Sequence, residues 1–275
     1  MSEKKAEMSQ AMRQKLAGKK FTKNPIPGTK YTIMISSAKG GVGKSTVAIN
    51  LAFALKNLGK KIGFLDADIY GPSLPKLIAI NEKPQSKDNK FLLPIEKYGV
   101  QFISMGFLVD ETTPMIWRGP MVISAIKTLT QKVLWKDLDF IIIDMPPGTG
   151  DTQLTFAQEV KVDGAVIVST PQDLALLDVK RGIQMFDKTK INVIGLIDNM
   201  SFFKADDGKN YNIFGEGGVE KTAKEFNKKF LGKVPISIEL RESSDLGLPL
   251  TYKKPEHDIS KIFLEIASKI KQDFV

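Results

Sequence analysis

Cysteine is absent from the 275-residue sequence, and histidine occurs only once. The missing thiols exclude disulfide bonds, thiolate catalysis and cysteine-held metal sites within this chain. Long apolar runs are also missing, since no stretch of about 18 residues could span a bilayer. No signal-type segment stands at the N-terminus. We therefore expect a cytoplasmic protein with no membrane partner.

Positive charge is concentrated near one end of the chain. The formal net charge is +9, and residues 1–30 hold eight Lys and Arg against Glu3 and Glu7. The rest of the sequence carries little net charge, which argues against a core that binds nucleic acid. We expect a basic, flexible N-terminal tail over residues 1–29 and one folded domain over residues 30–275.

A glycine-rich loop lies between a predicted strand and a predicted helix. Residues 31–35 are largely apolar, residues 36–46 read SSAKGGVGKST, and helical periodicity follows over residues 45–58. This order of strand, loop and helix is the context that a phosphate-binding loop requires. Its backbone N–H groups can turn inward and form an anion-binding nest at the positive end of the helix. The sequence therefore predicts a nucleotide site.

Each residue of this loop has an expected task. Positive backbone φ angles are expected at the three glycines. Lys44 would reach the β- and γ-phosphates, and the Ser45 hydroxyl would bind Mg²⁺. No Asn-Lys-x-Asp guanine signature occurs in the sequence, so ATP is expected. Nucleotide contacts are expected from Gly40, Gly41, Val42, Gly43, Lys44, Ser45 and Thr46.

Two aspartates follow a predicted buried strand over residues 61–65. Ligands of open parallel sheets bind beyond the carboxyl ends of the strands, so these acids should face the phosphates. We expect Asp68 to position the attacking water and to belong to the metal site with Ser45 and Asp144. Asp66 is expected to be its partner or to contact a Mg²⁺-bound water. The alternative is an Asp-rich turn that caps the helix after Pro72.

A second apolar strand, residues 140–143, ends on Asp144. This pattern is typical of the acid that holds Mg²⁺, here through water. The loop over residues 145–151 combines proline and glycine, which suits a segment that senses the γ-phosphate. Asp151 is expected to cap a helix over residues 152–159.

Strands alternate with helices along the remaining chain, which predicts an α/β fold: a doubly wound, mostly parallel sheet covered by helices on both faces. The pattern does not give the strand order. A hairpin is expected over 81–98, and residues 107–119 form a long connection in which Met115, Ile116, Trp117 and Arg118 either mark a partner surface or pack over the sheet. Further strands are expected over residues 100–105, 164–170, 191–197 and 233–236, and a loop over residues 202–218. Helices are expected over residues 121–133, after residue 173 as far as residue 188, over residues 219–230 and from residue 258 onwards.

The final helix carries one apolar stripe, formed by Ile259, Ile262, Phe263, Ile266 and Ile270. Such a stripe can cover a sheet, or it can lie on a membrane surface with its lysines among the headgroups. The core position is favoured, because a final covering layer is due here and no other segment remains to supply it. Asp258 is expected to cap this helix.

The loop sequence resembles the deviant Walker A ATPases of the ParA/MinD group, whose motif begins with an early lysine. Along residues 38–46, 66–73, 144–151, 169–172 and 199–203 the chain is similar to the Mrp/ApbC family of iron–sulfur cluster carrier ATPases. The resemblance implies a P-loop ATPase domain that works as an ATP-dependent homodimer, in which Lys39 reaches the partner's nucleotide. It also implies that Asn199 and the segment from Pro235 lie near adenine, and that clusters are delivered to apo-proteins.

One departure of the chain from that family is serious. Members carry Cys-x-x-Cys shortly after the Asn-Met-Ser motif, whereas residues 204–208 here read KADDG. Iron–sulfur clusters are held by thiolates, which argues against a cluster bound to this chain. The family's extra N-terminal domain is also replaced by the basic tail.

These observations predict a Mg²⁺-dependent ATPase in iron–sulfur cluster assembly, with apo-proteins or assembly factors as partners. The alternative is a ParA/MinD-like positioning switch that acts on membrane or DNA through the final helix or the basic tail. A metabolic kinase-like enzyme is a third class, but no residues for an acceptor pocket stand out.

Overall fold

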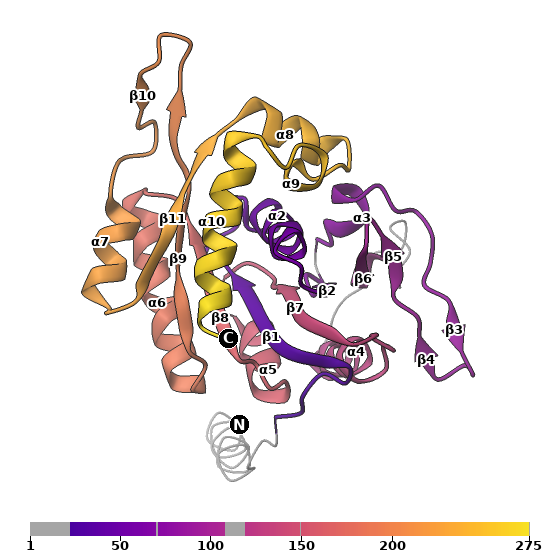
Figure 1. The fold of residues 1–275 in the computed structure, drawn as a ribbon. Coiled ribbons are helices and arrows are strands. Elements are labelled where there is room, and N and C mark those ends of the chain that lie inside the picture. Colours follow the sequence, from indigo (N-terminus) through magenta and orange to yellow (C-terminus); the bar gives the residue numbers. More distant parts are fainter. Residues whose placement is uncertain (1–22, 70, 108–118, 149, 275) are drawn as a thin grey trace, which may run out of the picture.

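The computed structural model describes residues 23–69, 71–107, 119–148 and 150–274. Its centre is a mostly parallel sheet, in which β11, β9, β8, β1, β7, β2 and β6 lie side by side in that order (Figure 1). The short strands β5 and β10 are antiparallel to β6 and β9. The bounds of these strands are β1 (Thr29–Ser36), β2 (Ile62–Asp66), β5 (Ile95–Lys97), β6 (Val100–Ser104), β7 (Leu138–Asp144), β8 (Gly164–Ser169), β9 (Val193–Lys204), β10 (Asn210–Tyr211) and β11 (Lys229–Ile236).

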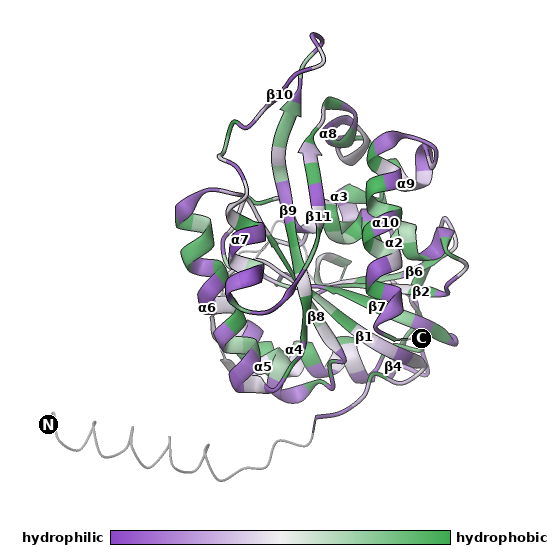
Figure 2. Cartoon of the chain, turned by 60° about the vertical axis from the view of Figure 1, so that its left-hand side comes forward, coloured by the Kyte–Doolittle hydropathy of each residue, from purple (hydrophilic) through white to green (hydrophobic). Residues whose placement is uncertain are grey.

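Helices cover both faces of this sheet, as the sequence predicts. Side chains alternate along β1, so Ile33 and Ile35 join the core under α2 and α10 while Met34 joins the core under α4 to α7. Figure 2 shows hydrophobic ribbon through the central strands and hydrophilic stretches on the outer helices. The helices are α2 (Lys44–Asn57), α3 (Leu74–Leu77), α4 (Gly119–Gln131), α5 (Asp151–Glu159), α6 (Asp173–Thr189), α7 (Gly218–Glu225), α8 (Ile238–Asp245), α9 (Leu250–Lys253), α10 (Asp258–Gln272) and the 3₁₀ turn η1 (Met105–Phe107).

The expected hairpin over residues 81–98 is confirmed, with β3 (Ser86–Lys87) antiparallel to β4 (Phe91–Leu92). The expected helix over residues 219–230 is wrong in its second half. α7 ends at Glu225, Asn227 takes a left-handed φ of 51°, and the chain enters β11 at Lys229. Pairing with β9 therefore overrides the helical pattern of these residues.

The strand expected over residues 191–197 continues much further than its apolar pattern. β9 runs to Lys204 with Met200 at a positive φ of 54°, and β10 pairs back onto Phe203 and Lys204. The expected loop over residues 202–218 thus begins as a hairpin, which projects from the sheet in Figure 1. Asp198 and Asn199 lie inside the strand, not in a loop after it.

Two expected helix caps are displaced by one residue. His257 occupies the N-cap of α10, and its Nδ1 accepts a hydrogen bond from the Ile259 N–H, so Asp258 is the first helical residue. Gly150 occupies the N-cap of α5, where Asp151 begins the helix. Asp258 nevertheless stays in the first turn of α10, where negative charge is favourable.

The apolar stripe of α10 is inside the protein. Ile259, Phe263, Ile266 and Ile270 are buried against α2 and β11, and Ile262 packs at their margin. The alternative in which this stripe lies on a membrane surface is therefore wrong. Among the described helices, none has the length and apolar character needed to cross a bilayer.

The last part of the expected tail contacts the folded domain. Ile26 is buried, and Asn24 exchanges backbone hydrogen bonds with Glu159 and Lys161 after α5. Residues 1–22 lie outside the described residues. So do Met115, Ile116, Trp117 and Arg118, for which a partner surface or packing over the sheet was expected.

Candidate functional site

The glycine-rich loop connects the carboxyl end of β1 to the first turn of α2. Gly41 and Gly43 have φ angles of 80° and 77°, whereas Gly40 lies outside the left-handed region, so the expectation for Gly40 is wrong. Gly43 occupies the N-cap position and Lys44 begins the helix. The loop therefore presents its amides at the positive end of α2, where anions bind.

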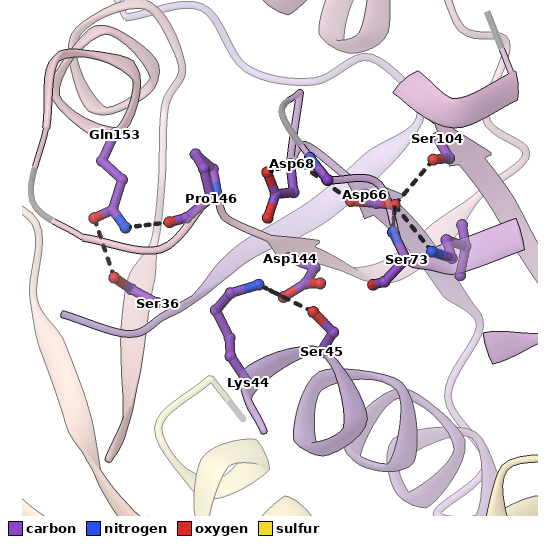
Figure 3. A network of polar contacts seen from close by, with 12 residues as sticks. Ser36, Lys44, Ser45, Asp66, Asp68, Ser73, Ser104, Asp144, Pro146 and Gln153 are labelled. Atoms are coloured by element: carbon purple, nitrogen blue, oxygen red, sulfur yellow. Dashed lines mark hydrogen bonds and ion pairs between the residues drawn. The ribbon is translucent and has the colours of Figure 1, made fainter. Parts of the chain in front are cut away.

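The amino group of Lys44 lies deep in the site. It forms an ion pair with Asp144 and lies 3.2 Å from the Ser45 hydroxyl oxygen (Figure 3). Only 6% of Lys44 is exposed. The pair forms because β1 and β7 are neighbours in register, with Ile35 opposite Asp144, so the loop after β1 starts beside the end of β7.

The donors around Asp144 suit a hydrated Mg²⁺. Its second carboxylate oxygen, Oδ2, is buried and has no hydrogen-bond partner among the residues that the structure describes. The Ser45 hydroxyl lies close to Asp144, because the Lys44 amino group contacts both side chains. Within the described part of the chain, no group of three or more His, Asp or Glu is arranged so that it could hold a metal ion by itself. These few oxygens fit an ion that keeps several waters and binds phosphate, as Mg²⁺ does.

Asp66 organises the segment that carries Asp68. Its Oδ2 accepts hydrogen bonds from the N–H groups of Ser73 and Leu74, both at 3.1 Å, and from the Ser104 hydroxyl at 2.9 Å. Its Oδ1 accepts one from the Asp68 N–H. The expected partnership with Asp68 is present, and Asp66 also caps α3, as in the alternative. Burial, with the neighbouring Asp144 charge, raises the pKa of Asp66 to about 7.

Asp68 borders an open pocket next to the loop after β7. The pocket has a volume of about 440 Å³ and is lined by Asp68, Gly71, Pro146, Pro147, Gly150, Thr152 and Gln153. Figure 3 shows the carboxylates of Asp68 and Asp144 at the same edge of the sheet, above Lys44. A water held by Asp68 would lie in this space. Lys39 is exposed at the start of the loop.

Asn199 lies against the phosphate loop. Its side-chain amide donates a hydrogen bond to the Val42 carbonyl at 2.8 Å, and a Cβ added at Gly43 would collide with the same amide. Pro235 lies in β11, which pairs with β9 beside Asn199. The structure thus brings β9 and β11 to the loop, on the side opposite Asp68.

Gln153 is the main site residue that the sequence analysis missed. It is buried on α5, bonded to Ser36 and to Pro146, and no motif marks it. Its only sequence signal is its place in the first turn of the helix after the predicted sensing loop.

The chain is similar to a known protein family along most of its length. The model of the family described as "ParA: NUBPL iron-transfer P-loop NTPase" matches residues 28–271. The iron-sulfur cluster carrier protein of Haemophilus influenzae is 48% identical over 247 residues, which are 89% of this chain and 67% of the relative. The iron-sulfur cluster transfer protein NUBPL of Mus musculus is 47% identical over 249 residues, 90% of this chain and 78% of the relative.

A solved structure extends the similarity to three dimensions. The nucleotide-binding protein of Archaeoglobus fulgidus, in complex with ADP, is 36% identical to this chain with a TM-score of 0.74. The match covers 86% of this chain and 93% of that one.

Proposed function

The chain belongs to the ParA/NUBPL family of iron-transfer P-loop NTPases, and from this premise we propose that it is a Mg²⁺-dependent ATPase acting in iron–sulfur cluster transfer to apo-proteins. The observation that carries the proposal is the buried contact between Lys44 of the phosphate loop and Asp144 at the end of β7. A phosphoryl-transfer site needs a lysine that binds phosphate and an acid that holds the metal, and this contact puts the residues proposed for these two tasks side by side.

The loop residues account for nucleotide binding. The amides of residues 40–46 would surround the phosphates, and Lys44 would place its ammonium against the γ-phosphate in place of the Asp144 oxygen. Ser45 and Asp144 would hold Mg²⁺, which supplies charge neutralisation on the phosphates. Asn199 keeps the loop in shape through Val42 and, with Pro235, would border the adenine.

Asp68 is the residue that we assign to the attacking water. Its backbone N–H is fixed by Asp66 and its side chain borders the open pocket. A carboxylate there can accept a hydrogen bond from the water and orient it toward the γ-phosphate. Asp66 serves this role indirectly, because it accepts hydrogen bonds from the backbone N–H groups of Asp68, Ser73 and Leu74.

The proposed working unit is a homodimer in the cytoplasm. Lys39 is exposed at the beginning of the loop, and a second copy facing this edge would receive it at its own nucleotide. Two lysines would then neutralise one γ-phosphate. The folded ATPase domain is proposed to comprise residues 30–275 together with the contacts made by residues 23–29.

The cluster is cargo in this proposal. Its thiolate ligands must come from another protein, because this chain has no cysteine. The hairpin that includes residues 204–208 offers Asp206 and Asp207, but no third acid or imidazole joins them within the described residues. We propose that ATP binding and hydrolysis regulate transfer between a cluster-bearing assembly factor and its apo-protein.

Turnover measurements on two single variants test the catalytic assignments. Asp68→Ala and Lys39→Ala should bind Mg²⁺-ATP with dissociation constants close to the wild type, because neither residue shapes the loop. Both should lose most ATP hydrolysis. Wild-type turnover in Asp68→Ala would remove the water-positioning role, and wild-type turnover in Lys39→Ala would remove the trans role.

A further inference from the structure

The loop after β7 is attached to the beginning of the phosphate loop. The Met145 N–H donates to the Ile35 carbonyl at 3.1 Å, and the Gly148 N–H donates to the Ser37 carbonyl at 2.8 Å. Farther along, a Cβ built at Gly40 would lie 3.9 Å from the Pro147 side chain, which is ordinary contact distance. A displacement of either loop must therefore act on the other.

The side chain of Gln153 adds a second link between the two loops. Its Oε1 accepts a hydrogen bond from the Ser36 hydroxyl at 3.1 Å, and its Nε2 donates to the Pro146 carbonyl at 2.5 Å (Figure 3). Only 2% of Gln153 is exposed. One side chain thus bonds the last residue of β1 to the second residue of the loop after β7.

The chemistry of the link requires an amide. An ionised glutamate could accept from Ser36 but could not donate to Pro146, and the thioether of a methionine cannot donate and accepts only weakly. Because Gln153 also lines the pocket next to Asp68, the bonded pair of loops forms one wall of the space in which the water would be held.

We propose that Gln153 is a positioning residue for the ATPase reaction: it holds residues 145–148 against the start of the phosphate loop, so that the two loops respond together to the γ-phosphate. The reaction step of this inference rests on the proposed function. The mechanical step, in which Gln153 restrains the loop, does not.

Hydrogen exchange and steady-state kinetics on the full chain test the two steps separately. The variants are Gln153→Met, which keeps the side-chain length and removes both bonds, Gln153→Glu, and Ser36→Ala, which removes one bond. Thr222→Val is the matched control, because it removes a buried hydroxyl that donates to the Gly218 carbonyl in α7.

Without nucleotide, exchange at the Gly148 amide should be at least tenfold faster in Gln153→Met than in the wild type. It should be intermediate in Gln153→Glu and in Ser36→Ala, each of which keeps one of the two bonds. With ATP, kcat should fall at least tenfold in Gln153→Met while KM stays within threefold. Ser36→Thr, which keeps the hydroxyl, should restore kcat relative to Ser36→Ala. Thr222→Val should match the wild type in both readouts.

Wild-type exchange at Gly148 in Gln153→Met overturns the inference, and so does a raised KM with unchanged kcat. If Gln153→Met does not fold, the same measurements are made on Ser36→Ala. Wild-type exchange at Gly148 in that variant, or a raised KM with unchanged kcat, then overturns the inference. A wild-type chain that hydrolyses no ATP contradicts the proposed function, and the exchange result in the nucleotide-free protein then still supports or overturns the restraint by Gln153.

Discussion

Single residues decide whether the phosphate loop can keep its shape. Gly43 combines a φ of 77° with a close approach to the Asn199 amide, so any side chain there is both strained and obstructed. Gly40 has neither restriction, since its φ is outside the left-handed region and its nearest neighbour is at 3.9 Å.

We accordingly expect Gly43→Ala to weaken ATP binding by at least a hundredfold and Gly40→Ala to weaken it by less than tenfold. The alanine at residue 43 must push Asn199 away from the Val42 carbonyl, which distorts the amide nest. Titration with a fluorescent ATP analogue measures both. Equal losses for the two variants would show that the left-handed geometry of Gly43 is not what the site needs.

A buried acid next to the site makes stability depend on pH. Asp198 is 1% exposed, and its Oδ1 has no hydrogen-bond partner among the described residues. Burial raises its pKa to about 7, with Lys233 lowering it and Glu220 raising it further. Since the folded pKa lies above the unfolded one, the contribution of Asp198 to stability is full below about pH 3.8 and is lost as pH rises through 7.

Asp198→Asn should therefore become more stable relative to the wild type as the pH rises from 4.5 to 8. The relative gain should be a few kcal/mol at most, because each pH unit between the two pKa values is worth about 1.4 kcal/mol. Asp66 also titrates near pH 7, but it is present in both proteins and cancels from the difference. Urea unfolding at the two pH values measures the change, and a difference that is constant with pH would contradict the titration of Asp198.

At the scale of elements, α10 is a structural layer of the domain. Phe263 is fully buried in the core shared with α2 and β11, whereas Lys261 on the same helix is exposed. Truncation of a buried phenylalanine removes its apolar contacts and leaves a cavity.

Phe263→Ala should lower the free energy of unfolding by about 3–5 kcal/mol, and Lys261→Ala should change it by less than about 0.5 kcal/mol. Chemical denaturation followed by circular dichroism gives both values. A loss below about 1 kcal/mol in Phe263→Ala would mean that the helix can leave the sheet, which would reopen a surface role for its stripe.

The elements also show what the sequence could and could not predict. The phosphate loop and the acids at the ends of β2 and β7 were predictable, because each follows an apolar strand directly in the chain. The strand order, the extension of β9 and the start of β11 depend on pairing between distant segments, which local periodicity does not contain. Gln153 was missed for the same reason: its Ser36 partner is 117 residues away.

At the scale of the whole molecule, the proposed ATPase site is separate from any cluster. The described fold brings together the residues proposed to bind the nucleotide, yet the chain has no thiolate to offer iron. The assembly that transfers a cluster must therefore include at least one cysteine-bearing partner.

Anaerobic reconstitution of the purified chain with iron and sulfide should leave less than about 0.1 labile iron per chain after desalting, because no described group of side chains can hold a cluster. Colorimetric iron and sulfide assays, with a cysteine-bearing relative treated in parallel, measure this. Stoichiometric iron and sulfide on this chain alone would show that it carries the cluster without thiolates.

The proposed function depends on binding of a nucleotide by Lys44, and calorimetric titration of Mg²⁺-ATP into the wild type and Lys44→Met tests this binding most directly. The account predicts saturable binding, one nucleotide per chain, in the wild type and at least a hundredfold weaker binding in the variant, whose folding is checked by circular dichroism. Absence of binding to the wild type, or equal affinity in a folded Lys44→Met, would contradict it.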